Sequence, residues 1–194
     1  FKGMKVRTVG WYMDILNRLG ASASPIPGSE LYLSLERGML DGAEFSAPAI
    51  SYPMGFDEIT KYVLSPGVHQ PGSQCYVFFN KGAWESLPRD LQEIVKLAAK
   101  ETQLWSYSWI QNLNSQAMNK LQESVEVVQM DKETLIEFAK VAHEYVEEIK
   151  QNHPNAKKII ESQEAFKKDF EIWRNARGNV VPWSYETYIN GRVD

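Results

Sequence analysis

Two charged residues that follow short predicted strands are the feature of this chain that most directly suggests chemistry. Glu44 stands at the exit of a short strand, residues 43–46, which comes soon after a charged helix end at Gly38. Arg7 stands near the end of an alternating segment, just before Gly10. The carboxyl ends of strands in an α/β sheet open onto the crevice where ligands bind. We therefore expect Arg7 and Glu44 to meet on one rim of a sheet.

The two side chains suit different ligand groups. A guanidinium can grip a carboxylate with two parallel hydrogen bonds, so Arg7 is suited to an anion. Glu44 is suited to a cation or a hydroxyl group. The alternative is that Arg7 and Glu44 only form a structural salt bridge at the rim, and their spacing does not decide between the two interpretations.

A loop rich in proline and glycine supplies two more candidates. Residues 65–72 contain Pro66, Gly67, Pro71 and Gly72, which restrict the path of the backbone. Such a loop could hold His69 and Gln70 toward the crevice, because binding residues are common on loops that a scaffold positions. The alternative is a plain connecting turn.

Motifs for catalysis and for transition metals are missing from the sequence. His69, His143 and His153 have no partner at metal-ligand spacing, and there is no His-Glu-x-x-His or Cys-x-x-Cys. The phosphate-binding loop, the dinucleotide glycine fingerprint and the Gly-x-Ser-x-Gly elbow are missing too. We therefore expect a binding protein and not an enzyme.

Composition excludes other classes of function. Of 194 residues, 43% are hydrophobic and 24% charged, which is typical of a globular protein. The net charge of −4 argues against a nucleic-acid partner, for which a basic face is expected. No segment approaches the roughly 18 apolar residues of a membrane span. The single cysteine, Cys75, lies in a predicted apolar strand, where we expect it to be packed.

The first part of the chain alternates short strands and helices. The pattern predicts strands at residues 4–9, 21–25, 43–46, 62–64 and 74–79, and helices at residues 11–19 and 29–38. Gly20 and Gly38 are expected to end these helices, and Ser29 to cap the second. Residues 48–54 are predicted as a loop or short helix. Alternating strands and helices indicate an α/β lobe, with a mixed or parallel sheet flanked by helices.

The second part is helical. Residues 88–124 contain no glycine and no proline after Pro88, which predicts one helix about 54 Å long. Its apolar residues recur at helical spacing and predict a buried stripe: Leu91, Val95, Ala98, Thr102, Trp105 and Trp109. A strand at residues 125–130 follows, then a helix at 132–151 capped by Asp131, a break at His153-Pro154 and a helix at 155–174. We predict three parts: an α/β ligand-binding lobe (1–87), a spanning helix with its return strand (88–130) and C-terminal helices (131–194).

Several segments together resemble a known family. They are Gly3-Met4-Lys5-Val6-Arg7, Pro27-Gly28-Ser29-Glu30-Leu31-Tyr32, Leu35-Glu36-Arg37-Gly38, Leu40-Asp41-Gly42-Ala43-Glu44, Gly55-Phe56, Pro66-Gly67 and Phe79-Asn80-Lys81. In order and spacing they resemble the DctP-like solute-binding proteins of the tripartite ATP-independent periplasmic (TRAP) transporters. The chain looks most like the branch that binds 2-oxo and 2-hydroxy monocarboxylates with a metal ion. That branch has an acidic-aromatic pair where Glu44-Phe45 stands, usually with Trp in place of Phe45.

The resemblance implies roles for the candidate residues. In such proteins two α/β lobes close over the solute, and the matching arginine, here Arg7, holds its carboxylate. Glu44 and the backbone carbonyl of Phe45, with Gln70, would coordinate Na⁺ or Ca²⁺, and no organic cofactor is implied. Substrate contacts would come from Arg7, Glu44, Phe45, His69 and Gln70.

The resemblance also implies a function and partners. It implies a periplasmic solute-binding subunit, made with a signal peptide, that passes a small organic acid to membrane permease subunits. The alternative is an extracytoplasmic sensor or interaction domain of the same fold; an enzyme acting on a carboxylate is a weaker third. Because Phe1-Lys2-Gly3-Met4 reads as a turn entering a strand, we expect the chain to be the later part of such a protein, with most of the N-terminal lobe outside it.

The aromatic residues of the helical part predict association. Trp105, Trp109, Phe166, Phe170 and Trp173 would form an apolar surface larger than monomers usually expose. The resembled branch includes members that form homodimers by exchanging a C-terminal helix, and the breaks at His153-Pro154 and Gly178 could serve as hinges. The alternative is that residues 155–174 fold back on their own chain.

Overall fold

The computed structural model describes residues 1–69 and 75–177. Gln70 and Gly178 lie outside these ranges. The chain divides into two compact units, Phe1–Val141 and Ala142–Asp194. The three-part division at residues 87 and 130 remains a prediction.

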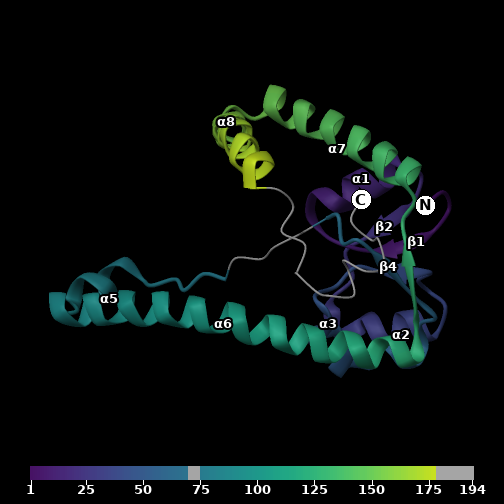
Figure 1. Ribbon diagram of the computed structural model, residues 1–194, viewed down its shortest axis with the longest axis horizontal. Coiled ribbons are helices and arrows are strands. Elements are labelled where there is room, and N and C mark those ends of the chain that lie inside the picture. Colours follow the sequence, from purple (N-terminus) through teal and green to yellow (C-terminus); the bar gives the residue numbers. More distant parts are fainter. Residues whose placement is uncertain (70–74, 178–194) are drawn as a thin grey trace. The chain divides into compact units, whose positions relative to one another are not determined.

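A three-stranded parallel sheet organises the start of the first unit (Figure 1). Strand β1 (Lys5–Arg7) lies between β2 (Ser22–Ser24) and β3 (Gly42–Ala43). Helices α1 (Gly10–Arg18) and α2 (Leu31–Glu36) connect the strands. The core of this region contains Val6, Ile15, Leu16, Leu31 and Leu40, all buried. The predicted α/β lobe with parallel strands is confirmed.

Local signals predicted the ends of the first two helices better than their starts. Gly20 and Gly38 follow α1 and α2 with φ of +90° and +66°, a conformation that favours glycine. Ser29 is not the cap of α2, because it lies inside a short 3₁₀ turn, Gly28–Glu30, that continues directly into the helix. The strand predicted at 43–46 is shorter, so Glu44 directly follows β3.

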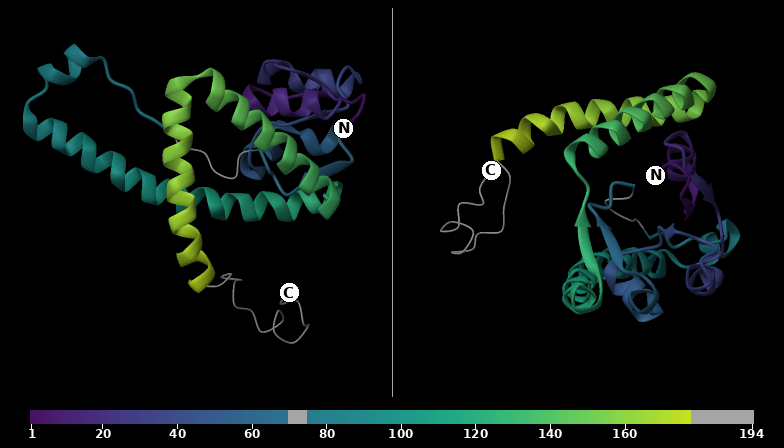
Figure 2. Two further views of the ribbon diagram at one scale, coloured as in Figure 1. Left: turned by 90° about the horizontal axis from the view of Figure 1, so that it is seen from above. Right: turned by 90° about the vertical axis from the view of Figure 1, so that its right-hand side faces the viewer.

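A second, two-stranded parallel sheet pairs distant parts of the first unit. Strand β4 (Tyr62–Ser65) lies beside β5 (Glu126–Gln129), as Figure 2 shows. Short helical segments precede β4: α3 (Pro48–Ser51), a 3₁₀ turn (Tyr52–Met54) and α4 (Phe56–Ile59). Helix α3 packs on the long helix α6 (Arg89–Ser124), where Ala49 N donates to Asn114 Oδ1 at 3.0 Å. The β4–β5 pair therefore anchors the loop that contains His69.

The long helix α6 has the predicted length of 36 residues, but its predicted buried stripe is wrong. The Trp105 and Trp109 rings stack at 5.2 Å with exposed fractions of 60% and 49%. Only Ala117 and Leu121 of α6 are buried, near the end where α3 and α4 pack on it. The stripe is exposed because the described part of the chain has no element that covers the middle of α6.

The strand predicted at residues 74–79 is also wrong for the residues that the structure describes. Residues 75–80 have no regular secondary structure, and Tyr76, Val77 and Phe78 are largely exposed. An apolar segment forms a strand only when a neighbouring strand takes up its hydrogen bonds, and none of the described strands pairs with this one. For the same reason Cys75 is exposed and not packed.

Two helices end the described chain. Helix α7 (Lys132–Asn152) begins in the first unit, with Asp131 as its N-cap: Oδ1 accepts from Thr134 N at 2.7 Å. Helix α8 (Pro154–Arg177) follows the predicted break. Within the second unit, Lys150 bridges Glu147 and Glu164 at 2.9 and 3.1 Å.

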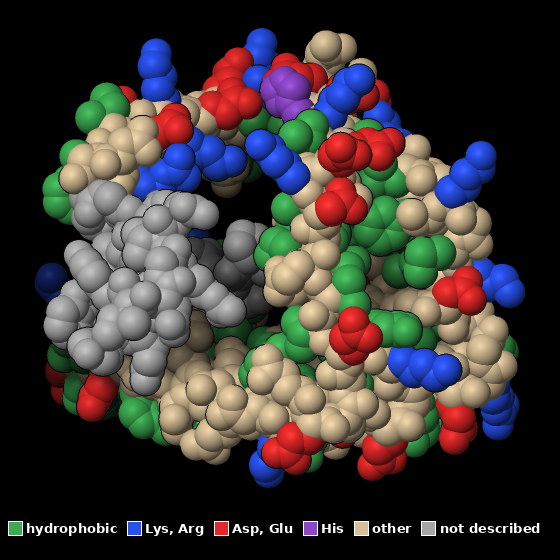
Figure 3. Space-filling model, turned by 45° about the vertical axis from the view of Figure 1, so that its right-hand side comes forward, with side chains coloured by type: hydrophobic (Ala, Val, Ile, Leu, Met, Phe, Trp, Pro, Cys, Tyr) green, Lys and Arg blue, Asp and Glu red, His purple; other side chains and the backbone are tan. Residues whose placement is uncertain are grey.

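Charge and apolar length describe the outside of the molecule further. On the face drawn in Figure 3, positive and negative side chains are interspersed. None of the helices within residues 1–69 and 75–177 is long and apolar enough to cross a membrane.

Candidate functional site

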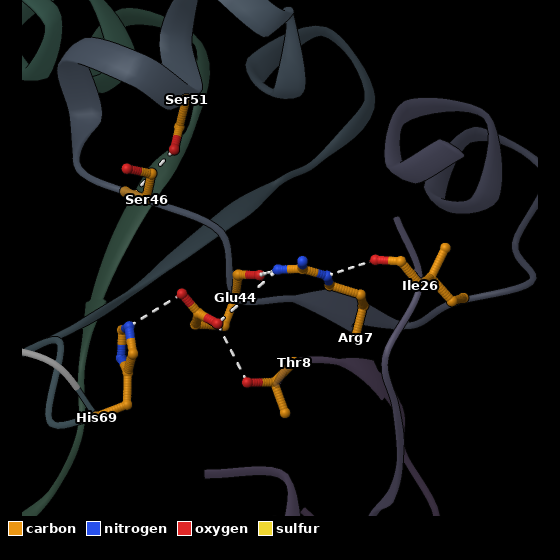
Figure 4. Close-up of polar contacts among 7 residues, drawn as sticks. All are labelled: Arg7, Thr8, Ile26, Glu44, Ser46, Ser51 and His69. Atoms are coloured by element: carbon orange, nitrogen blue, oxygen red, sulfur yellow. Dashed lines mark hydrogen bonds and ion pairs between the residues drawn. The ribbon is translucent and has the colours of Figure 1, made fainter. Parts of the chain in front are cut away.

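Arg7 is buried at the carboxyl end of β1 and is held by main-chain groups. Its exposed fraction is 9%. Nε donates to the carbonyl of Ile26 at 2.9 Å, and Nη1 donates to the carbonyl of Glu44 at 2.6 Å (Figure 4). The ring of Phe45 lies 5.7 Å from the guanidinium carbon. These contacts fix the guanidinium before any ligand arrives.

One edge of this guanidinium remains available. Nη2 has no hydrogen-bond acceptor among residues 1–69 and 75–177. The side chain of Arg7 is 11% exposed, so the guanidinium is not fully enclosed. A fixed positive charge with unused N–H donors is suited to binding a carboxylate.

Glu44 follows β3 and lies beside Arg7. Its backbone N–H donates to the carbonyl of Arg7 at 2.8 Å. Oε2 accepts from Thr8 Oγ1 at 3.1 Å and lies 3.9 Å from Arg7 Nη1. Oε1 lies 3.1 Å from Nε2 of His69, on the opposite side of the carboxylate (Figure 4). The ion pair with Arg7 exists, but the shortest contact between the two residues is to the Glu44 carbonyl.

Phe45 packs between an arginine and a glycine. Its ring meets Phe56 edge-on at 5.6 Å, and it covers the guanidinium of Arg7. A Cβ atom at Gly28 would lie 2.8 Å from Cε2 of Phe45, which is closer than real contacts allow. Gly28 therefore leaves room for the Phe45 ring.

His69 completes the cluster through an aromatic contact. Its ring lies 5.0 Å from that of Tyr12, which lies 5.6 Å from that of Phe138 at the start of α7. Burial, and then the charge of Glu44, raise the pKa of Tyr12 above its ordinary value of 10.0. The phenol is therefore protonated at neutral pH.

Four of the five expected site residues thus lie together: Arg7, Glu44, Phe45 and His69. The fifth, Gln70, lies outside the described residues. The sequence analysis missed Thr8, Tyr12 and Phe138. Thr8 directly follows Arg7 and Tyr12 lies in the next helical turn, so their positions offered a signal. Phe138 offered none, because its contact depends on where α7 packs.

The oxygen atoms in the cluster fit part of a site for a hard cation. Na⁺ and Ca²⁺ prefer carboxylate and carbonyl oxygens, which Glu44 and Phe45 supply. The described residues hold no group of three or more His, Cys, Asp or Glu side chains that could bind a metal. The donor types fit such an ion, while further ligands would have to come from the solute, water or other residues.

Comparisons with known proteins show which family the chain resembles. The family model for bacterial extracellular solute-binding proteins of family 7 (DctP) matches residues 1–152. A monocarboxylate 2-oxoacid-binding periplasmic protein of Nostoc sp. is 30% identical over 97% of this chain and 51% of its own length. The chain spans about half the length of the first two curated relatives that it matches.

Solved structures show the same fold. A TRAP periplasmic solute-binding protein from Pseudoalteromonas atlantica with bound sodium and pyruvate has a TM-score of 0.81 at 29% identity, over 89% of this chain and 53% of that chain. One from Bordetella bronchiseptica with calcium and picolinate has a TM-score of 0.81 at 24% identity, over 98% and 55%.

These matches decide between classes of protein. The matched proteins bind solutes and are not enzymes, as expected from the missing catalytic motifs. The family model covers well over half of the chain. The chain belongs to the bacterial extracellular solute-binding proteins of family 7, the solute-binding proteins of TRAP transporters.

Proposed function

We propose that this chain carries the Arg7 side of the solute site in the periplasmic binding subunit of a TRAP transporter. The solute is a small organic acid, a 2-oxo or 2-hydroxy monocarboxylate. The observation that carries the proposal is the state of Arg7: buried, held by two main-chain carbonyls, and with no acceptor for Nη2 among the described residues. Nη2 is the group that takes the carboxylate of the solute.

The relatives support the choice of solute class. The Nostoc relative is named for binding 2-oxoacids, and the Pseudoalteromonas structure contains pyruvate. More distant structures contain other solutes, among them orotic acid, galacturonate and 2-amino-1-propanol, at 21% to 22% identity. The proposal of a 2-oxo or 2-hydroxy monocarboxylate as the solute therefore depends on Arg7 and on the two more similar proteins.

A cation is part of the proposal. Na⁺ or Ca²⁺ would be held by the carboxylate of Glu44, the carbonyl of Phe45 and Gln70, and its positive charge would join the protein to the anionic solute. His69 lies 3.1 Å from Oε1 of Glu44, so it limits the space on that side of the carboxylate. Sodium and calcium in two of the matched structures support this choice.

The proposal includes two kinds of partner. Membrane permease subunits receive the solute from the periplasmic subunit. A second copy of the chain binds through the C-terminal helices, where Phe166 and Phe170 stack at 5.5 Å and Trp173 is 57% exposed. One matched structure is described as a dimer, which supports association.

Calorimetry of the full-length protein tests the proposed function. Pyruvate, lactate and longer 2-oxoacids are titrated with Na⁺, with Ca²⁺, and with neither ion. The proposal predicts saturable binding of at least one of these acids that is stronger with an ion present. If none of these acids binds with either ion, the proposal is wrong.

A further inference from the structure

Besides Nη2 of Arg7, the Tyr12 hydroxyl is a donor in the cluster for which the described residues supply no acceptor. Thr8 Oγ1 donates to Glu44 Oε2, and His69 Nε2 lies against Glu44 Oε1. Nε and Nη1 of Arg7 are bound to carbonyls. Among residues 1–69 and 75–177, burial and the charge of Glu44, and no hydrogen bond, affect the Tyr12 hydroxyl. Tyr12 is half-buried.

Two neighbouring aromatic rings hold the Tyr12 ring in place. It lies between the rings of His69, at 5.0 Å, and Phe138, at 5.6 Å. Tyr12 lies in the first turn of helix α1, which begins at Gly10, shortly after β1 ends at Arg7. The hydroxyl is therefore presented from a helix and held by two aromatic contacts, while the carboxylate of Glu44 lies close enough to affect its ionisation.

We propose that the Tyr12 hydroxyl is a specificity-determining donor that binds the oxygen at C2 of the solute while Arg7 binds its carboxylate. This inference rests on the proposed function. A 2-oxo or 2-hydroxy acid differs from a plain carboxylate by one acceptor oxygen next to the carboxylate. A site can recognise this oxygen with a donor that is not already bonded to the protein. Tyr12 supplies one, and its raised pKa keeps the proton on the phenol at neutral pH.

The test is the variant Tyr12→Phe in the full-length protein, which keeps the ring and removes the hydroxyl. Calorimetry with pyruvate, lactate and propionate compares the two acids that carry a C2 oxygen with one that lacks it. Loss of one neutral hydrogen bond should weaken pyruvate and lactate about 3- to 10-fold and change propionate less than about twofold.

Tyr32→Phe is the matched control. Tyr32 also has a raised pKa, and its hydroxyl donates to Glu58 Oε2 at 3.3 Å, outside the Arg7 cluster. This variant should bind all three acids like the parent protein. Melting temperatures of both variants show whether either substitution disturbs folding.

The outcomes separate this inference from the proposed function. If the parent binds pyruvate and Tyr12→Phe binds it equally well, the inference is wrong and the proposed function stands. If Tyr12→Phe weakens pyruvate, lactate and propionate equally, the hydroxyl is structural and the inference is wrong. If the parent binds none of the acids, the proposed function fails and this inference fails with it.

Discussion

Arg7 and Glu44 are joined mainly through the main chain of Glu44. Arg7 Nη1 donates to the Glu44 carbonyl at 2.6 Å, whereas the nearest carboxylate oxygen lies 3.9 Å away. The bond from Glu44 N to the carbonyl of Arg7, at 2.8 Å, ties the same two residues a second time. The charge of Glu44 can therefore be removed without removing the support of Arg7.

Glu44→Gln is predicted to abolish the effect of Na⁺ or Ca²⁺ on solute binding while the fold is kept. The substitution replaces a hard anionic ligand with a neutral one of the same shape. Calorimetry of the full-length variant with pyruvate, with and without each ion, measures the effect. Glu58→Gln changes a carboxylate outside the cluster and is the control. An ion dependence in Glu44→Gln equal to that of the parent would favour the structural salt bridge.

Gly28→Ala is predicted to lower the free energy of unfolding by about 1 to 3 kcal/mol, as overpacking does. The new Cβ would lie 2.8 Å from the Phe45 ring, which is confined by Phe56. Gly42→Ala is the control, because a Cβ there meets no heavy atom within 4 Å. Urea unfolding compares the two variants. Equal stabilities would show that the Phe45 ring moves aside freely.

Asp131→Ala is predicted to destabilise the protein more at neutral pH than in acid. The backbone N–H of Thr134 is the main cause that lowers the pKa of Asp131 below its ordinary 3.8. A carboxyl group whose pKa is lower in the folded state stabilises the protein at pH values above its ordinary pKa. This stabilisation is lost as the pH falls through the pKa of the folded state. Urea unfolding at about pH 7 and about pH 3 measures the difference.

The control for Asp131 is Asp169→Ala, an exposed aspartate on α8. Its substitution should change stability little at either pH. If Asp131→Ala lowers the free energy of unfolding by the same amount at both pH values, the charge of the carboxylate does not contribute to the helix cap.

Truncation after Gln151 is predicted to convert a dimer into a monomer. This change removes α8 and its exposed aromatic residues, which we propose to lie in the dimer contact. Light scattering gives the mass. A chain that ends at Arg177 keeps α8 and should remain a dimer. Unchanged mass after truncation at Gln151 would show that α8 does not hold two copies together.

The sequence predicted those features that depend on neighbouring residues. Gly20 and Gly38 ended helices because each needs a positive φ, and the run without glycine or proline after Pro88 formed one helix. Features that depend on distant contacts were not predictable. Residues 75–79 needed a partner strand, and the stripe that contains Trp105 needed a covering element.

The same distinction applies to the site. Arg7 and Glu44 could be placed on one rim because parallel strands end at the same edge of a sheet. The contact between Tyr12 and His69 could not, because it depends on the path of the loop after β4. Nor did the sequence show that main-chain carbonyls would take up two of the nitrogens of Arg7.

Titration of Arg7→Lys with pyruvate tests the central claim most directly. Lysine keeps the positive charge, but its single ammonium group lacks the planar shape of the guanidinium. It cannot donate to the carbonyls of Ile26 and Glu44 and also bind the solute in a fixed orientation. In the full-length protein we expect a loss of about 2 to 5 kcal/mol, or roughly 30-fold or more in Kd, with Arg37→Lys, an exposed arginine, unchanged. A Kd for Arg7→Lys within about twofold of the parent value would contradict the assignment of Arg7 as the group that binds the carboxylate.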